Sequence, residues 1–174
     1  MSRFVRAFTF AIALVAMAML AAPAAAQPRD FLTTLEADKI RDAEEPRERI
    51  RLFVLFAEDR LKKFQYELAK GGTDKRRHER MASLLDAFAG CMDDASELME
   101  LGRVKQQDIL KGVQFLQAKS KELLPELDRL LAATPDSAPY KENMEFAQLA
   151  VKEALEEAEK ASKEIAPGPV RRKQ

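Results

Sequence analysis

Hydrophobic residues recur every three or four positions along most of this chain, which is the spacing of one face of an α-helix. Residues that break helices divide the pattern at Pro46, at the pair Gly71-Gly72 and at the stretch TPDSAP that begins at Thr134. The expected helices run over 33–44, over 46–70, from just after Thr73 to near Gly102, over 104–133 and over 139–165. We therefore predict an all-α fold: an antiparallel up-down bundle of four long helices, with the short first helix alongside.

Four features of the sequence refine this prediction. Thr33 is followed three residues later by Glu36, which is the spacing of a capping box at a helix start. Pro46 suits the first position of the second helix, where its missing N–H group costs nothing. Pro125 lies inside the fourth helix and predicts a kink there. The last helix carries mostly Ala on a heptad spacing, the repeat of coiled-coil packing, so its neighbours can approach it closely.

Five apolar residues follow one another in the second predicted helix, with the sequence LFVLF at 52–56. Five residues are too few to span a membrane, and flanking ion pairs four residues apart favour a helix over a strand. Leu52, Leu55 and Phe56 fall outside the core stripe, so something else must cover them. These three residues are candidates for an interaction surface, covered by the first helix, by a second subunit or by a client protein.

The N-terminal region has the features of a secretory signal peptide. Arg3 and Arg6 precede an Ala-rich and Leu-rich apolar run that ends in small residues before Gln27. We expect export through the general secretory route to a soluble periplasmic or extracellular location; an uncleaved membrane anchor is the alternative. No later apolar run is long enough for a transmembrane segment. The expected organisation is a signal peptide over 1–26, a linker over 27–31, a helical bundle over 32–165 and a disordered basic tail over 166–174.

Charge and cysteine content limit the classes of partner. The chain holds 29 basic and 29 acidic residues, so no overall charge attracts it to nucleic acid. A protein partner or self-association fits this balance better. Cys91 is the only cysteine and cannot form an internal disulfide. Its position in the apolar stripe suits a small buried hydrophobe, and an intermolecular disulfide in an oxidising compartment is the alternative.

The sequence offers no catalytic constellation and no cofactor motif. His78 is the only histidine, and neither a G-x-S-x-G nucleophile elbow nor a C-x-x-C-H haem site is present. Non-covalent haem held by His78 and a Met is a formal alternative, but Met at helical spacing is usually core filler. We therefore predict no catalytic residues, no cofactor and no enzymatic activity.

Two charged clusters could hold a ligand. A basic turn precedes and opens the third helix, and its candidate anion ligands are Lys75, Arg76, Arg77 and Arg80. An acidic ridge recurs every seven residues along the same helix, at Glu79, Asp86, Asp93 and Glu100. Glu97 fills the gap between the last two, and Asp93, Glu97 and Glu100 are weak candidates for Ca²⁺ or Mg²⁺. Either cluster could equally be a solvated surface, because runs of charge usually are.

A resemblance adds to this reading. It rests on Leu32-Thr33, the acidic stretch from Arg41 to Pro46, Arg49-Ile50, Phe56-Ala57 and Arg60-Leu61. This opening pattern is similar to that of a family of exported, uncharacterised bacterial all-helical proteins, and the clear match covers about a fifth of the chain. The resemblance implies an exported helical protein and transfers no site residues.

The function that we expect from the sequence is therefore a non-catalytic exported helical protein that acts by binding, as a scaffold, an adaptor or a holdase-like module. The alternative is a bundle that binds an anion, a metal ion or a small ligand through the basic turn at 75–80 or the acidic ridge at 93–100.

Overall fold

The computed structural model describes residues 31–72 and 74–165. Within these residues the chain forms five helices and no strand, which confirms the predicted all-α bundle. The helices are α2 (Thr34–Asp42), α3 (Pro46–Lys70), α4 (Lys75–Val104), α5 (Leu110–Ala133) and α6 (Lys141–Glu164). The predicted signal peptide over 1–26, the linker up to residue 30 and the tail over 166–174 lie outside the described residues.

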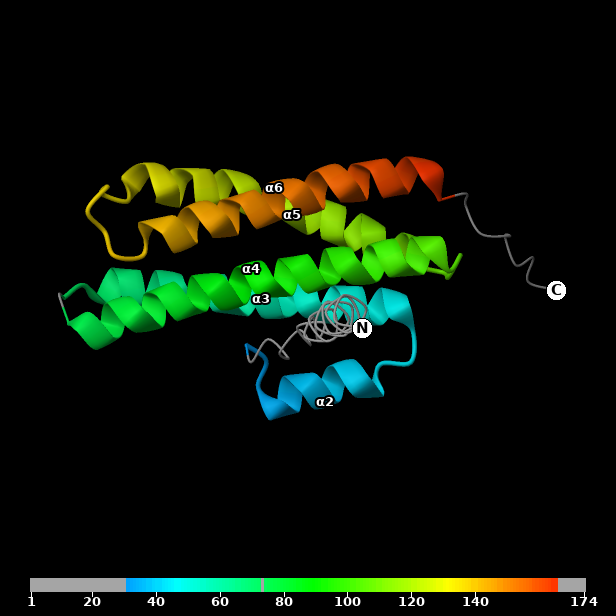
Figure 1. Ribbon diagram of the computed structural model, residues 1–174, viewed down its shortest axis with the longest axis horizontal. Coiled ribbons are helices and arrows are strands. Elements are labelled where there is room, and N and C mark those ends of the chain that lie inside the picture. Colours follow the sequence, from blue (N-terminus) through cyan, green and yellow to red (C-terminus); the bar gives the residue numbers. More distant parts are fainter. Residues whose placement is uncertain (1–30, 73, 166–174) are drawn as a thin grey trace, which may run out of the picture. The chain divides into compact units, whose positions relative to one another are not determined.

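The four long helices pack as two antiparallel hairpins, α3 with α4 and α5 with α6 (Figure 1). The hairpins stack so that α4 lies beside α6 and α3 lies beside α5, while α4 and α5 occupy a diagonal. Two cross-helix contacts show that α4 and α6 run parallel: Asn143 donates to Asp86 near one end, and Arg103 pairs with Glu164 near the other. Periodicity predicted the alternation of helix direction but not this order of neighbours.

The core lies between the hairpins and draws its largest side chains from all four long helices. Phe64, Phe88, Leu116 and Met144 are fully buried, one from each helix. Burying an apolar side chain of this size contributes about 1.5–3 kcal/mol. The buried face of α6 is mostly Ala, which lets α6 approach its neighbours closely, as expected.

The predicted helix starts are largely confirmed. Thr33 and Glu36 form the capping box at α2, and Pro46 stands in the first turn of α3. The expected N-cap Thr73 lies outside the described residues, and Asp74 accepts a hydrogen bond from the Arg76 N–H at the start of α4. Helix α5 continues through Pro125 from one end to the other.

The boundary between the third and fourth helices differs from the prediction. The fourth helix was expected to begin at Val104, but Val104 ends α4, and α5 begins at Leu110. Gln106 adopts a positive φ of 54°. The N–H of Gln107 bonds to the carbonyl of Gly102, and the N–H of Gln106 bonds to that of Arg103. This is a Schellman motif, in which the left-handed position is usually Gly. Because Gln occupies this position here, the sequence contains no glycine signal for the end of the helix.

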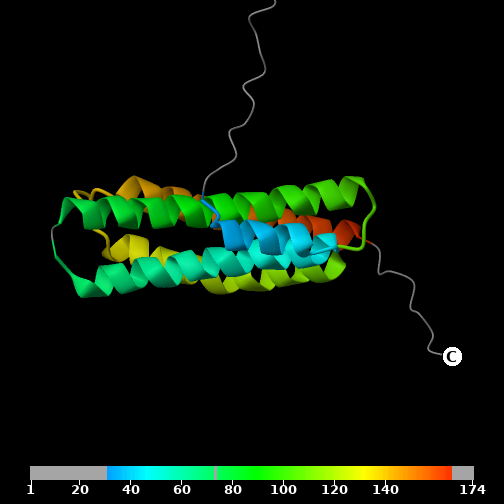
Figure 2. The same cartoon turned by 90° about the horizontal axis from the view of Figure 1, so that it is seen from below.

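Helix α2 lies along the outside of α3 and α4 (Figures 1 and 2). It buries none of its own side chains, although Phe31, Leu32 and Ile40 are partly buried against the core. None of the described helices is both long enough and apolar enough to cross a membrane.

Candidate functional site

The four cations of the predicted basic turn are not all on the surface, because the Arg77 side chain is buried in the fold. Its side chain is only 8% exposed. The guanidinium donates to the carbonyl oxygens of Glu67, Leu68 and Gly72, with 2.8 Å from Nη1 to the Gly72 oxygen. Arg77 therefore donates to carbonyl groups at the end of α3 and just beyond it, and its charge suits the negative end of the helix dipole.

The other three cations of the turn are exposed. Lys75 pairs with Glu79 at 3.7 Å, and Arg80 pairs with Glu67 at 3.5 Å. A shallow cleft of about 350 Å³ lies beside Lys75 and Glu79 and is also lined by His78. The ring of His78 lies 6.2 Å from that of Tyr140. Basic and acidic side chains alternate here, so an incoming anion meets no concentrated positive charge.

The acidic ridge, in contrast, forms one wall of a groove. Because α4 and α6 run side by side, Asp93, Glu97 and Glu100 of α4 face Glu153 and Glu157 of α6 across an opening of about 520 Å³. Its apolar lining comes from Leu101, Val104, Ala150 and Ala154. We call this feature the α4/α6 groove. Sequence reasoning missed the two glutamates of α6, because only the order of helix packing brings them to α4.

Electrostatics in the α4/α6 groove favour a cation. Burial raises the pKa of Glu157, and the negative charges of Glu153, Glu100 and Asp93 raise it further. Hydrogen bonds from Arg103 instead lower the pKa of Glu100. The groove therefore concentrates carboxylates that repel one another, and Arg103 offsets this at one end, where it also binds Glu164.

The carboxylates are not arranged to hold a metal ion. Among the described residues, no group of three or more His, Cys, Asp or Glu side chains could hold one. Asp93, Glu97 and Glu100 thus line the groove without converging on a single point. The groove suits a ligand that spreads its positive charge over a greater length.

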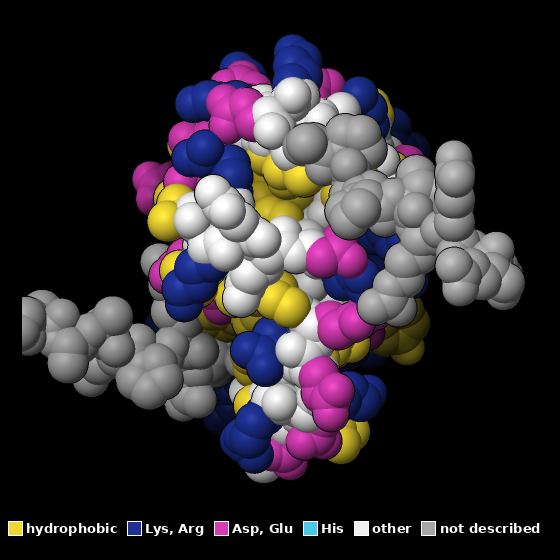
Figure 3. Space-filling model, turned by 90° about the vertical axis from the view of Figure 1, so that its right-hand side faces the viewer, with side chains coloured by type: hydrophobic (Ala, Val, Ile, Leu, Met, Phe, Trp, Pro, Cys, Tyr) yellow, Lys and Arg dark blue, Asp and Glu magenta, His cyan; other side chains and the backbone are white. Residues whose placement is uncertain are grey.

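Exposed apolar side chains border the same groove. Val104 is 67% exposed, and Phe146 is 55% exposed. Residues 146, 150, 153 and 157 follow a spacing of four, three and four, so Phe146 continues the strip of α6 that lines the groove. Figure 3 views the bundle from the end at which α4 and α6 finish, where hydrophobic side chains show between acidic and basic ones.

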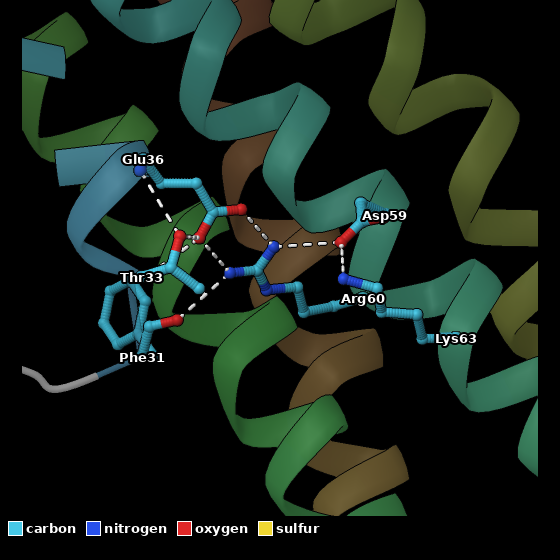
Figure 4. Close-up of polar contacts among 6 residues, drawn as sticks. All are labelled: Phe31, Thr33, Glu36, Asp59, Arg60 and Lys63. Carbon is cyan, nitrogen blue, oxygen red and sulfur yellow. Dashed lines mark hydrogen bonds and ion pairs between the residues drawn. The ribbon is translucent and has the colours of Figure 1, made fainter. Parts of the chain in front are cut away.

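A second polar cluster ties the N-terminal segment to the bundle (Figure 4). Arg60 of α3 is only 5% exposed. Its two terminal nitrogens each lie 2.6 Å from an oxygen of Glu36, and Nη2 also donates to the carbonyl of Phe31 at 3.2 Å. Asp59 lies 3.0 Å from Nη1 and pairs with Lys63 as well. The hydrogen bonds from Arg60 lower the pKa of Glu36 to about 2.

Cys91 is fully buried. Burial raises the pKa of its thiol to about 12, so the unreactive thiol form is the one present at neutral pH. Of the two interpretations of Cys91, this environment matches the small buried hydrophobe.

The proposed interaction surface at LFVLF is smaller than the sequence indicated. Phe56 is buried and Leu52 is half-buried against the core. Leu55 alone of the three is exposed, at 43%. The N-terminal segment does pack on α3, and its described anchor there is Arg60.

Comparison with known proteins adds no relatives. No protein-family model, no curated protein and no solved structure matches this chain.

Proposed function

We propose that the protein is a non-catalytic, exported helical binding protein, and that it binds a basic amphipathic segment of a protein partner along the α4/α6 groove. The observation that carries this proposal is the combination of an apolar lining and five carboxylates in one groove. A segment with cationic side chains and an apolar face would satisfy both parts of it.

The dimensions of the groove support a helical or extended segment over a small ion. Phe146 and Glu157 are eleven residues apart on α6, which is about 16 Å along the helix axis. Exposed Phe146 lies at one end of this strip of α6, and exposed Leu101 and Val104 of α4 line the groove near the end at which α4 finishes. A partner helix of about three turns would match this length, with apolar residues at both ends and Lys or Arg between them.

Two reactive side chains are placed away from the groove, which supports binding over catalysis. Cys91 is buried with a raised pKa, and His78 lies beside Tyr140. Neither residue lines the α4/α6 groove. The exported location rests on the N-terminal sequence, where basic residues precede an apolar run and a small-residue cleavage site.

A fluorescence titration tests the proposal, because the chain contains no tryptophan. A Lys/Leu amphipathic helical peptide with one Trp is titrated with the protein, and a Glu/Leu peptide of the same pattern is titrated in parallel. We expect saturable binding of the Lys/Leu peptide that weakens as salt is added. Equal binding of both peptides would contradict the proposal.

Matched variants locate the binding. Glu153→Gln with Glu157→Gln removes two charges that line the groove, and we expect it to weaken binding about tenfold, since each exposed ion pair contributes up to about 1 kcal/mol. Glu145→Gln with Glu156→Gln makes the same charge change on the same helix at residues outside the groove lining. Equal weakening by both pairs would show that overall charge, and not the groove, attracts the peptide.

A further inference from the structure

The segment Phe31–Asp42 is held to the bundle at a few points. Helix α2 buries none of its own side chains, and Leu35, on its first turn, is well exposed. Its described attachments are the ion pair of Glu36 with Arg60, the contact of the Phe31 ring with α4, and the partial burial of Leu32 and Ile40 against the core. A segment attached in this way resembles a bound peptide more than a core helix.

The first part of the site that holds this segment is a buried cation. Arg60 is as buried as the hydrophobic core, yet it is charged, and it offers both terminal nitrogens to one carboxylate. A buried charge whose partner is removed is strongly destabilising. The neighbouring Asp59 is shared with Lys63 and contacts only Nη1. The site therefore requires a carboxylate from outside α3.

The second part is a notch at Gly90 on α4. A Cβ added to Gly90 would lie 2.6 Å from Cε1 of Phe31, so a methyl group there would displace the ring from its present position. Glycine inside a helix is normally unfavourable compared with Ala. The notch and the cation together recognise three features: an aromatic ring, the carbonyl of the same residue, and a carboxylate five residues later.

The capping box preorganises the segment for this site. The carboxylate of Glu36 accepts hydrogen bonds from the Thr33 N–H and the Thr33 hydroxyl, each at 2.9 Å. Both of its oxygens remain bound to Arg60. The segment forms this helix start from its own residues. The Glu36 carboxylate can therefore be positioned in the same way in a free peptide and in the attached segment.

We propose that the notch at Gly90 and the buried Arg60 form a peptide-binding site, that Phe31–Asp42 fills it within its own chain, and that it also accepts the same segment from a second copy. Exchange of an identical element between copies needs no new contacts. The connection to α3 suits exchange, since Ala43 and Glu45 are both extended and Pro46 follows. The site shares no residue with the α4/α6 groove, so it is independent of the proposed function.

The attached segment has the advantage in dilute solution, because a short tether gives an effective concentration of the order of millimolar. A free peptide therefore meets a filled site in the wild-type chain, and its apparent affinity falls in proportion to the vacant fraction. Disabling the attached segment while leaving Arg60 and Gly90 in place should reveal the site.

The test uses the full chain with Phe31→Ala and Glu36→Ala, and a labelled peptide of residues 31–43 that is acetylated and amidated to remove terminal charges. Fluorescence anisotropy measures binding. We expect the double variant to bind the peptide at least about tenfold more tightly than the wild-type chain. The peptide should also raise the melting temperature of the double variant and leave that of the wild type unchanged.

Controls separate this site from loss of folding. Circular dichroism checks that the double variant stays helical; the single variant Phe31→Ala keeps the ion pair and should show the same trend. Asp38→Asn changes a charge on α2 that pairs with Arg41 on the surface, and it should behave like the wild type. A peptide that carries Glu36→Gln and Phe31→Ala should not bind.

Two outcomes would overturn the proposal: a helical double variant without saturable binding, or equal binding of the substituted peptide. A mixture of wild-type chain and double variant tests exchange between copies. We expect a heterodimer in sedimentation as the protein concentration approaches the effective concentration of the attached segment, which is of the order of millimolar. Its absence there would exclude the second copy as an occupant.

Discussion

Arg60 and Arg77 place two guanidinium groups inside the fold, and each fixes the end of a helical segment. Arg77 binds the carbonyl groups at the end of α3, and Arg60 binds the carboxylate at the start of α2. Charged hydrogen bonds of this kind are stronger than neutral ones. Two single charged residues therefore position the end of α3 and the start of α2, which the hydrophobic pattern alone does not fix.

The pKa of Glu36 gives a prediction about pH. Its value of about 2 lies below the ordinary 4.5 because of Arg60, so the folded state favours the ionised carboxylate. The stabilisation by this group should be complete above about pH 4.5 and should disappear as the pH falls toward about 2. Urea unfolding should show Glu36→Gln less stable than the wild type by about 2 kcal/mol at pH 7, and the difference should shrink in acid. A difference that is independent of pH would contradict this account.

Gln106 gives a second prediction at this scale. Its φ of 54° is a conformation that a residue with a Cβ adopts only at a cost, whereas Gly adopts it freely. Gln106→Gly should therefore stabilise the protein by up to about 1 kcal/mol in urea unfolding. Gln107→Gly, one position later, is the control, and no gain is expected there because Gln107 lacks a positive φ. A loss of stability in Gln106→Gly would show that the turn is not strained.

At the scale of elements, two glycines allow close packing against very different neighbours. A Cβ on Gly90 would meet the tip of the Phe31 side chain, and a Cβ on Gly112 would meet the backbone of Arg47 at 3.0 Å. A side chain at the edge of the bundle can move aside, whereas the backbone of a packed helix cannot. Gly112 therefore sets the approach of α3 and α5, and Gly90 affects the N-terminal segment alone.

A double-mutant cycle tests this distinction. Gly90→Ala in the wild-type chain should destabilise, because the new methyl group displaces the Phe31 ring. In a Phe31→Ala background the same change should stabilise by up to about 1 kcal/mol, since Ala is the better helix former. Equal effects in both backgrounds would show that the ring does not occupy the notch.

On the scale of the whole molecule, the four long helices share one core. A single cluster of buried hydrophobic residues includes side chains from α3, α4, α5 and α6. Neither hairpin can therefore keep its buried face covered without the other. A single-core bundle over 31–165 is short enough that we expect it to unfold in one cooperative step.

Cys91 provides an internal reporter of that step. It is fully buried and is the only cysteine in the chain, so thiol labelling at its position requires the packing around α4 to open. Helical ellipticity and Cys91 labelling should change at the same urea concentration, with one m-value of about 1–3 kcal/mol/M. Labelling at a lower urea concentration than the loss of ellipticity would reveal a separately unfolding hairpin.

Much of the local structure could be predicted, because it depends on neighbouring residues. Spacing of apolar residues, Thr33 with Glu36, and Pro46 located the helices and two of their starts. The end of α4 could not be predicted, because Gln106 gives no glycine signal. Three of the five carboxylates that line the α4/α6 groove were predicted, but Glu153 and Glu157 were not, because they reach the groove only through packing.

The sequence by itself determined the class of the fold and the extents of most helices, because hydrophobic periodicity and capping act within a few residues. The tertiary structure decided that α4 lies beside α6, that Arg77 belongs to the end of α3, and that Arg60 takes its carboxylate from Glu36. These choices join residues far apart in the chain, and one helix can present the same apolar stripe to either neighbour. Only the packing of all the helices at once selects the pairs that form.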